Sequence, residues 1–253
     1  LNHPRLLEVL YASSLIGAVL VPINYRLTPQ EIEFIAEDAG LHVLCADQAA
    51  AIVLEQGLEG LGCAHFLGVD FENPVWQSMQ NLLIARSQPL DASHAEASHA
   101  ECVAVSEDDI ALIMYTSGTT GRPKGAQLTH GNIFWNLLNA KFMEETMRHA
   151  TLTCAPLFHI GGLNVTTHPS LVSGVHVVLH KVFDAEQILV DIERYGISTM
   201  FGAPTMFDMM RREPRFDETD FSSVLAFNCG AAPVPLPLIE TYASKNVTFC
   251  QGY

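Results

Sequence analysis

The sequence is poor in basic residues and contains no apolar run long enough to cross a membrane. Lysine and arginine total 13 against 28 aspartates and glutamates, which gives a net charge of −15. That balance argues against a nucleic-acid or anionic-membrane partner, although one local basic site can still hold a nucleotide. The longest apolar stretch, from Leu15 to Ile23, falls far short of the ~20 residues that a membrane span needs.

Signals for metal binding, disulfides and secretion are also missing. The six cysteines form no C-x-x-C pair, so we expect buried free thiols in a reducing compartment and no structural zinc. Nothing resembles a cleavable signal, so we expect a cytoplasmic protein. The chain opens at Leu1 without a methionine, so we expect its true amino terminus to be missing. The six cysteines are Cys45, Cys63, Cys102, Cys154, Cys229 and Cys250.

What the sequence does contain is a sizeable core built from alternating strands and helices. Of 253 residues, 49% are hydrophobic, enough for one large or two ordinary domains. Apolar β-type runs alternate with helical patterns, which predicts an α/β fold with a largely parallel sheet. The expected strands are residues 41–46, 110–115, 151–155, 175–179, 197–201, 224–228 and 247–250.

Two helices have clear start signals, and one segment reads as a linker. Thr28-Pro-Gln-Glu31 and Asp184-Ala-Glu-Gln187 are capping-box patterns, stopped by Gly40 and Gly196. Residues 87–105 lack an apolar period and predict an exposed linker between lobes 1–86 and 106–253. Within it, His94 and His99 indicate a solvated loop rather than a metal site, because two histidines in a flexible segment are poorly preorganised.

The most informative segment is Tyr-Thr-Ser-Gly-Thr-Thr-Gly-Arg-Pro-Lys-Gly at residues 115–125. Its hydroxyls can donate to phosphate oxygens, its glycines let backbone N–H groups approach an anion, and Lys124 adds a positive charge. An ordinary turn is the alternative, but the loop follows an apolar strand, where open α/β sheets bind ligands. It is not a Walker A loop, because Arg122 and Pro123 precede the lysine and residues 125–129 look extended.

Two further segments follow predicted strands. Cys229-Gly-Ala-Ala-Pro-Val-Pro235 is a small-residue turn that could lie against a planar ring, and Gln251-Gly252-Tyr253 places an aromatic where a base needs a stacking partner. Each alone is more often a plain turn. Together with the phosphate segment, they predict a constellation on one edge of one sheet.

These segments resemble those of the acyl-adenylate-forming superfamily, in particular its AMP-forming acyl-CoA synthetase (fatty-acid–CoA ligase) branch. The matching runs, in order, are residues 115–125, Pro156-Leu-Phe-His-Ile-Gly-Gly162, Gly202-Ala-Pro-Thr205, Gly230-Ala-Ala-Pro233 and Gln251-Gly-Tyr253. Residues 17–31 resemble the family's early helix and turn, so nearly the whole chain is covered. The resemblance implies the amino-terminal, two-lobed part of that fold, with layered α/β sheets and helices on both faces.

The resemblance also implies a reaction and its residues. A carboxylate attacks the α-phosphate of ATP to give acyl-AMP and pyrophosphate, and a thiol, usually coenzyme A, then displaces AMP. Tyr253 would stack on the base, beside Gln251 and Gly252, and Thr116 would contact Mg²⁺. Residues implied to hold the phosphates are Thr116, Ser117, Gly118, Thr119, Thr120, Gly121 and Lys124, and those implied to line adenine and the acyl pocket are Gly230, Ala231, Ala232 and Pro233.

His159 is ambiguous without the resemblance, since a histidine in an apolar run is by default a packed residue. The resemblance places it beside the substrate carboxylate, with Thr116 and Lys124 as the other catalytic candidates and with Gly161 and Gly162 leaving room for the acid. Phe158, Thr205 and Met206 are weaker pocket candidates, for which core packing is an equal alternative.

The sequence departs from the family by stopping early. The motif at 251–253 normally continues to a glutamate that helps bind Mg²⁺, and the carboxyl-terminal domain with its adenylation lysine is absent. We therefore expect this piece alone to be inactive. A medium- or long-chain fatty acid is the expected substrate, because no lysine or arginine beside His159 would match a second carboxylate. The alternatives are an aryl acid, a carrier-protein acceptor in place of coenzyme A, and a catalytically silent interaction domain; a homodimer stays open.

Overall fold

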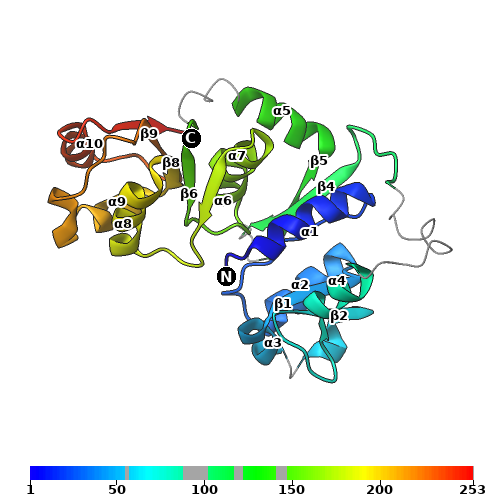
Figure 1. Cartoon of the computed structure of the whole chain (residues 1–253). Coiled ribbons are helices and arrows are strands. Elements are labelled where there is room, and N and C mark those ends of the chain that lie inside the picture. Colours follow the sequence, from blue (N-terminus) through cyan, green and yellow to red (C-terminus); the bar gives the residue numbers. More distant parts are fainter. Residues whose placement is uncertain (55–56, 88–101, 117–121, 141–146, 253) are drawn as a thin grey trace. The chain divides into compact units, whose positions relative to one another are not determined.

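The computed structural model describes residues 1–54, 57–87, 102–116, 122–140 and 147–252 (Figure 1). They form two compact units, a smaller one of Leu7–Thr129 and a larger one of Leu1–Leu6 with His130–Tyr253. Helix α1 (Pro4–Leu15) runs from the larger unit into the smaller one. The division at Thr129 does not coincide with the linker expected at 87–105, of which residues 88–101 lie outside the described part.

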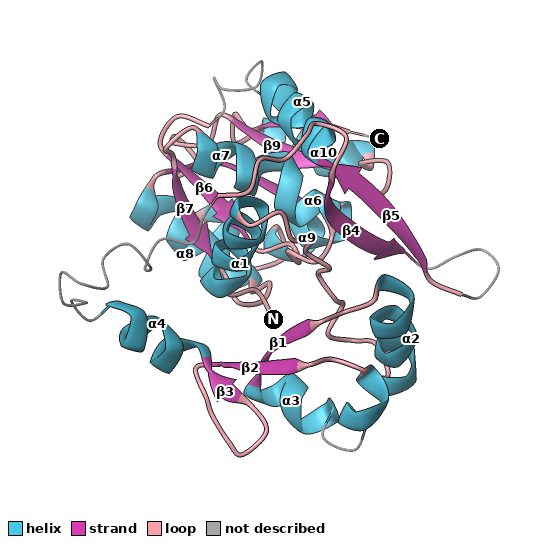
Figure 2. Ribbon diagram, turned by 90° about the vertical axis from the view of Figure 1, so that its right-hand side faces the viewer, coloured by secondary structure: helices cyan, strands magenta, loops and turns pink. Residues whose placement is uncertain are grey.

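The smaller unit contains a three-stranded parallel sheet with the order β1-β2-β3 (Figure 2). Its core gathers around Trp76, which is fully buried and packs edge-on against Phe66 at 5.3 Å between ring centres. The expected strand at 41–46 is therefore present, shifted by one to two residues. The elements are β1 (Val43–Asp47), α3 (Gln48–Leu54), η1 (Leu58–Leu61), β2 (His65–Val69), β3 (Gln77–Ser78) and α4 (Met79–Ser87).

Helix α2 (Pro29–Ala39) begins and ends where its sequence signals predict. The Thr28 side chain accepts from the backbone N–H of Glu31 at 3.4 Å, and the Glu31 carboxylate accepts from the Thr28 backbone N–H at 2.8 Å. Gly40 ends the helix with φ 62°, a left-handed conformation that glycine adopts without strain. The capping box contributes about 1 kcal/mol, typical of such caps.

The phosphate segment lies in an antiparallel hairpin rather than in a parallel sheet. Strands β4 (Ile110–Thr116) and β5 (Lys124–Thr129) pair antiparallel, which confirms that residues 125–129 are extended. Together they form a two-stranded sheet of their own among the described residues. The expectation of one shared sheet edge is therefore wrong for this segment, because a short hairpin reverses the chain where a crossover would have kept it parallel.

The larger unit contains a five-stranded parallel sheet in the order β10-β9-β8-β6-β7 (Figure 1). The strands are β6 (Ala150–Thr153), β7 (His176–Leu179), β8 (Ile197–Gly202), β9 (Ala226–Cys229) and β10 (Thr248–Gln251). All neighbouring pairs are parallel, so their carboxyl ends meet at the same edge. The connecting elements are α8 (Ala185–Tyr195), α9 (Pro204–Met210), η5 (Pro214–Asp217) and α10 (Leu236–Ala243).

The core of this unit is aromatic at its centre. Tyr242 is fully buried, stacks edge-on against Phe207, Phe227 and Phe249, and donates its hydroxyl to the Phe207 carbonyl at 2.9 Å. That hydrogen bond satisfies the one polar atom that the ring would otherwise bury at a cost. Helix α8 packs on this core. It begins at Asp184, whose side chain accepts from the Gln187 N–H and so forms one half of the predicted capping box, and it ends at Gly196 in the left-handed region, as predicted.

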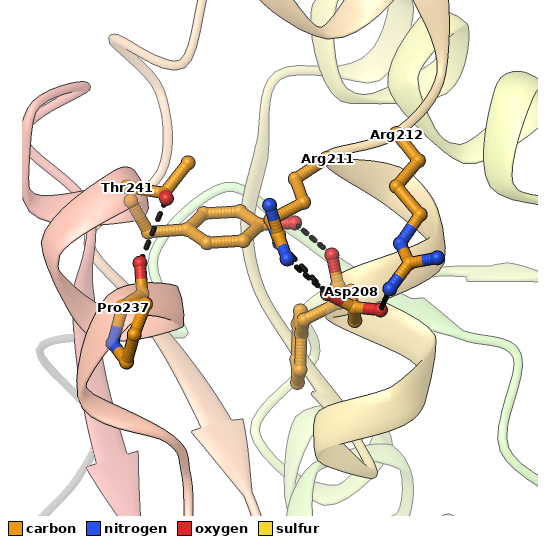
Figure 3. A network of polar contacts seen from close by, with 7 residues as sticks. Asp208, Arg211, Arg212, Pro237 and Thr241 are labelled. Atoms are coloured by element: carbon orange, nitrogen blue, oxygen red, sulfur yellow. Dashed lines mark hydrogen bonds and ion pairs between the residues drawn. The ribbon is translucent and has the colours of Figure 1, made fainter.

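Helix α9 ends in a small ion network on its solvent side (Figure 3). The Asp208 carboxylate contacts Arg211 at 2.6 Å and Arg212 at 2.5 Å, one helical turn away. Such partly exposed pairs contribute only about 0.3–0.5 kcal/mol each. On α10, Thr241 donates to the Pro237 carbonyl at 2.8 Å.

Between β6 and β7 the chain forms three short helices in succession, α6 (Ile160–Gly162), the π-helix η4 (Leu163–Thr167) and α7 (His168–Val172). Hydroxyl pairs tie them to β6: Thr153 with Thr167 at 2.6 Å, and Thr151 with Ser170 at 2.7 Å. Helix α5 (His130–Ala140) precedes β6 and donates from the Asn136 amide to the Asn164 carbonyl at 3.0 Å. No described helix is both long and apolar enough to span a bilayer.

Candidate active site

Two of the expected phosphate-binding side chains stand opposite each other at the end of the hairpin where the loop connects its two strands. Thr116, the last residue of β4, pairs with Lys124, the first residue of β5. Both side chains are exposed. The loop that joins them holds Ser117, Gly118, Thr119, Thr120 and Gly121, which lie outside the described residues. The hairpin therefore brings the threonine hydroxyl and the lysine charge to the two ends of the hydroxyl-rich loop.

Tyr115 anchors this end of the hairpin to helix α2. Its hydroxyl donates to the Asp38 carboxylate at 2.5 Å. Its ring covers the facing Gly125, where an added Cβ would lie 3.1 Å from Tyr115 Cζ and 2.8 Å from Ile113 Cγ2. Partial burial, and then the bond to Asp38, raise the pKa of Tyr115 to about 12, so the phenol keeps its proton and stays a donor at neutral pH. A side chain at residue 125 would therefore displace the Ile113 or Tyr115 side chain.

The other expected site segments follow strands at one edge of the parallel sheet in the larger unit. Residues 154–162 follow β6, residues 203–206 follow β8, residues 230–235 follow β9, and Gly252 follows β10. The sheet order places β8 between β6 and β9. This is the edge at which parallel α/β sheets bind ligands. Of the three segments predicted to share one sheet edge, the turn after β9 and the segment after β10 do so, and their role in binding stays a prediction.

His159 is an exposed helix cap, not a packed core residue. Its Nδ1 accepts a hydrogen bond from the Gly161 backbone N–H at 3.1 Å. A neutral ring with Nδ1 as acceptor carries its proton on Nε2. Asn2 fixes the segment just before it, because the Asn2 amide donates to the Ala155 carbonyl at 3.0 Å and accepts from the Leu157 N–H at 2.9 Å. The imidazole is thus held at the start of α6 through its Nδ1 atom.

The ring of Phe201 lies between two glycines of the segments that follow its two neighbouring strands, β6 and β9. An added Cβ on Gly161 would lie 2.5 Å from one ring edge, and one on Gly230 would lie 3.1 Å from the other. At Gly162 the space is filled by the Pro156 carbonyl, 2.2 Å from an added Cβ. The space where a Cβ of residue 161 or 162 would lie is therefore filled in this structure by the Phe201 ring and by the Pro156 backbone. That these glycines leave room for the substrate stays a prediction.

The three weaker pocket candidates differ in how far they are buried. Thr205 is exposed at the first turn of α9, whereas Met206 is half-buried against the hydrophobic core and accepts from the Ala203 N–H through its sulfur at 3.4 Å. Phe158 is half-buried. Core packing therefore accounts for Met206, while Thr205 stays available at the edge of the sheet.

The turn after β9 combines exposure with backbone strain. Ala231, Ala232 and Pro233 are exposed, and Ala231 has φ 71°, a left-handed conformation that is unfavourable for a residue with a Cβ. Gln251 does not project freely: its side-chain carbonyl accepts from the Val234 N–H at 3.0 Å. Gly252 is exposed, and Tyr253 lies outside the described residues.

Of the four residues named above that hold the site segments, three carry no sequence signal of their own. Phe201 reads as an ordinary apolar strand residue, Asn2 stands far from every motif, and Asp38 is one of many helical carboxylates. Tyr115 is the exception, since it opens the loop motif directly. The contacts of the other three join segments distant in sequence, so only the fold could reveal them.

Comparison with known proteins places this arrangement in a family. The chain is 36% identical over its whole length to a feruloyl-CoA synthase of Amycolatopsis sp, covering 47% of that protein, and 32% identical over 96% of its length to the long-chain-fatty-acid–CoA ligase FadD13 of Mycobacterium tuberculosis, covering 46%. It matches the inhibitor-bound N-terminal domain of FACL13 from Mycobacterium tuberculosis with a TM-score of 0.82 and 29% identity, covering 100% of this chain and 60% of that one. The chain thus spans about half the length of the curated relatives it matches. Residues 1–253 match the AMP-binding enzyme family model, and the chain belongs to the AMP-binding enzyme family.

Proposed function

We propose that the protein carrying this chain joins a carboxylic acid to coenzyme A through an acyl-AMP intermediate, at the expense of ATP. The observation that carries the proposal is the pairing of Thr116 with Lys124 across the β4–β5 hairpin, which sets a hydroxyl and a cation at the ends of the phosphate-binding loop. Attack of a carboxylate on a phosphate joins two anions, so catalysis depends on positioning and on charge neutralisation. Lys124 supplies that charge.

Magnesium fits this site only as a companion of the nucleotide. Among the described residues, no three histidine, cysteine, aspartate or glutamate side chains gather as metal ligands do. Mg²⁺ is commonly held by one or two protein oxygens together with substrate phosphates, and the exposed Thr116 hydroxyl is one such oxygen. When bound, the ion neutralises phosphate charge. Thr116 and Lys124 themselves orient the triphosphate, and His159 Nε2–H is available to donate to the carboxylate.

For the acid, we place an aryl acid first and a fatty acid second, which reverses the order expected from the apolar motifs. The support is the Phe201 ring framed by Gly161 and Gly230, since aromatic edges favour contact with another ring, and the higher identity to a feruloyl-CoA synthase than to a fatty-acid ligase. A carrier protein is the alternative acceptor.

The test is acid-dependent ATP–pyrophosphate exchange by the full-length protein with cinnamates, benzoates and straight-chain acids. We expect exchange with cinnamates to exceed exchange with fatty acids, and coenzyme A to outperform a carrier protein as acceptor. The 253-residue chain alone is expected to show none, because it spans about half of its relatives. Folded full-length protein without exchange on any acid would favour the silent interaction domain instead.

A further inference from the structure

The side chain of Gln251 is hydrogen-bonded to the turn after β9. Gln251 is the last residue of β10, the edge strand next to β9. Its side-chain oxygen accepts from the Val234 N–H at 3.0 Å, across 17 residues of sequence. Val234 is buried, so this bond satisfies a backbone donor that would otherwise be costly to bury.

The turn that Gln251 contacts is strained. Ala231 has φ 71°, and a non-glycine residue holds such a conformation only when its surroundings over-determine it. Three hydrogen bonds surround the turn: Gly230 N–H to the Gly202 carbonyl at 3.3 Å, Gly252 N–H to the Cys229 carbonyl at 2.9 Å, and the Gln251 bond to Val234. Gln251 supplies the only one of these three that comes from a side chain.

We infer that Gln251 is a positioning residue that holds residues 230–234 in their strained form, so that the exposed Ala231, Ala232 and Pro233 present one fixed surface to the nucleotide and the acid. This inference rests on the proposed function for its ligands. It changes the role expected for Gln251, because its side-chain oxygen is already bonded to the turn.

A double-mutant cycle separates this role from direct contact. Gln251→Met removes the acceptor and keeps a side chain of similar length, and Ala231→Gly removes the strain, since glycine adopts left-handed φ freely. In the full-length protein, we expect Gln251→Met to raise the KM for ATP about tenfold, the loss of one hydrogen bond, with kcat changed less. In the Ala231→Gly background, the same change should raise KM no more than about threefold, because a relaxed turn needs no clamp.

Equal fold-changes in the two backgrounds would overturn the inference in favour of direct contact, and an unchanged KM in Gln251→Met would overturn it outright. If Gln251→Met does not accumulate as folded protein, Gln251→Asn, whose amide is one methylene too short, takes its place. The melting temperature is measured for the same four proteins, and the drop caused by the Gln251 change should shrink when residue 231 is glycine. The melting temperature can be measured without turnover. An inactive wild type would therefore count against the proposed function, while the positioning role of Gln251 could still be tested.

Discussion

The edge of the Phe201 ring takes the place of a side chain at Gly161. An added Cβ on that glycine would lie 2.5 Å from Phe201 Cε1 and 2.7 Å from Cζ, well inside contact distance. Gly161 lies in α6, which follows β6, and Phe201 is the next-to-last residue of β8, so this contact joins the carboxyl-end regions of two neighbouring strands at the candidate site. The Phe201 ring can therefore keep its present position only if residue 161 has no side chain.

Gly161→Ala should alter acid binding more than stability. The new methyl group meets the far end of an aromatic side chain that can swing away, whereas in Gly162→Ala it meets the Pro156 carbonyl at 2.2 Å. We expect Gly162→Ala to destabilise by about 1–3 kcal/mol, the usual cost of overpacking, and Gly161→Ala by less, with a several-fold change in the KM for the acid. Gly57→Ala, where an added Cβ would meet only the Leu54 carbonyl at 4.0 Å, is the control. Urea unfolding measures the stability change, and exchange kinetics measure the KM for the acid. Equal stability losses at residues 161 and 162 would contradict the prediction.

Tyr115→Phe should loosen the base of the phosphate loop. It removes the hydroxyl that donates to Asp38 and keeps the ring that covers Gly125. We expect a stability loss of about 0.5–1 kcal/mol, because Asp38 is exposed and water replaces part of the bond, and a several-fold rise in the KM for ATP. Asp38→Asn, which retains an acceptor, should behave like the wild type. An ATP KM unchanged in Tyr115→Phe would show that the anchor does not act on the loop.

Lys124→Ala should reduce catalysis and leave folding almost unchanged. The lysine is an exposed end residue of β5, so its removal should shift stability by no more than about 0.5 kcal/mol. Loss of a charged contact to phosphate should lower kcat/KM of pyrophosphate release by about 10- to 100-fold. Arg122→Ala, an exposed cation two residues earlier, is the matched control. Wild-type pyrophosphate release in Lys124→Ala would refute the role given to this residue.

Acid should destabilise the larger unit through His168. Burial disfavours the charged imidazole and lowers the pKa of His168 to about 4. Between pH 6.5 and 4, this histidine is therefore protonated in the unfolded chain but not in the native state. The stability contributed by the neutral ring is complete above about pH 6.5 and is lost as pH falls through 4, by at most about 3 kcal/mol. His168→Gln should flatten urea midpoints over this window relative to the wild type. His176→Gln, at an exposed histidine nearby in sequence, should leave the slope as it is.

Much of the local structure could be predicted from sequence because it depends on neighbouring residues. The caps of α2 and α8 lie at Thr28 and Asp184, and all seven expected strands exist within a few residues of their predicted bounds. The order and pairing of the strands were harder to predict from the sequence. The apolar run at 110–115 resembles a buried parallel strand, yet its partner is the next strand along the chain, β5, so it became half of a hairpin.

The sequence alone determined the site segments, their chemistry and their family resemblance, since glycines, hydroxyls and a lysine at fixed spacing are a local property of the chain. Which residues hold those segments follows from the fold. Asn2 binds Ala155 across 153 positions, Tyr115 binds Asp38 across 77, and Gln251 reaches Val234 because β10 pairs with β9. Such contacts follow from strand order and connection geometry, which no local pattern encodes, and they fix the positions of groups that the motifs only name.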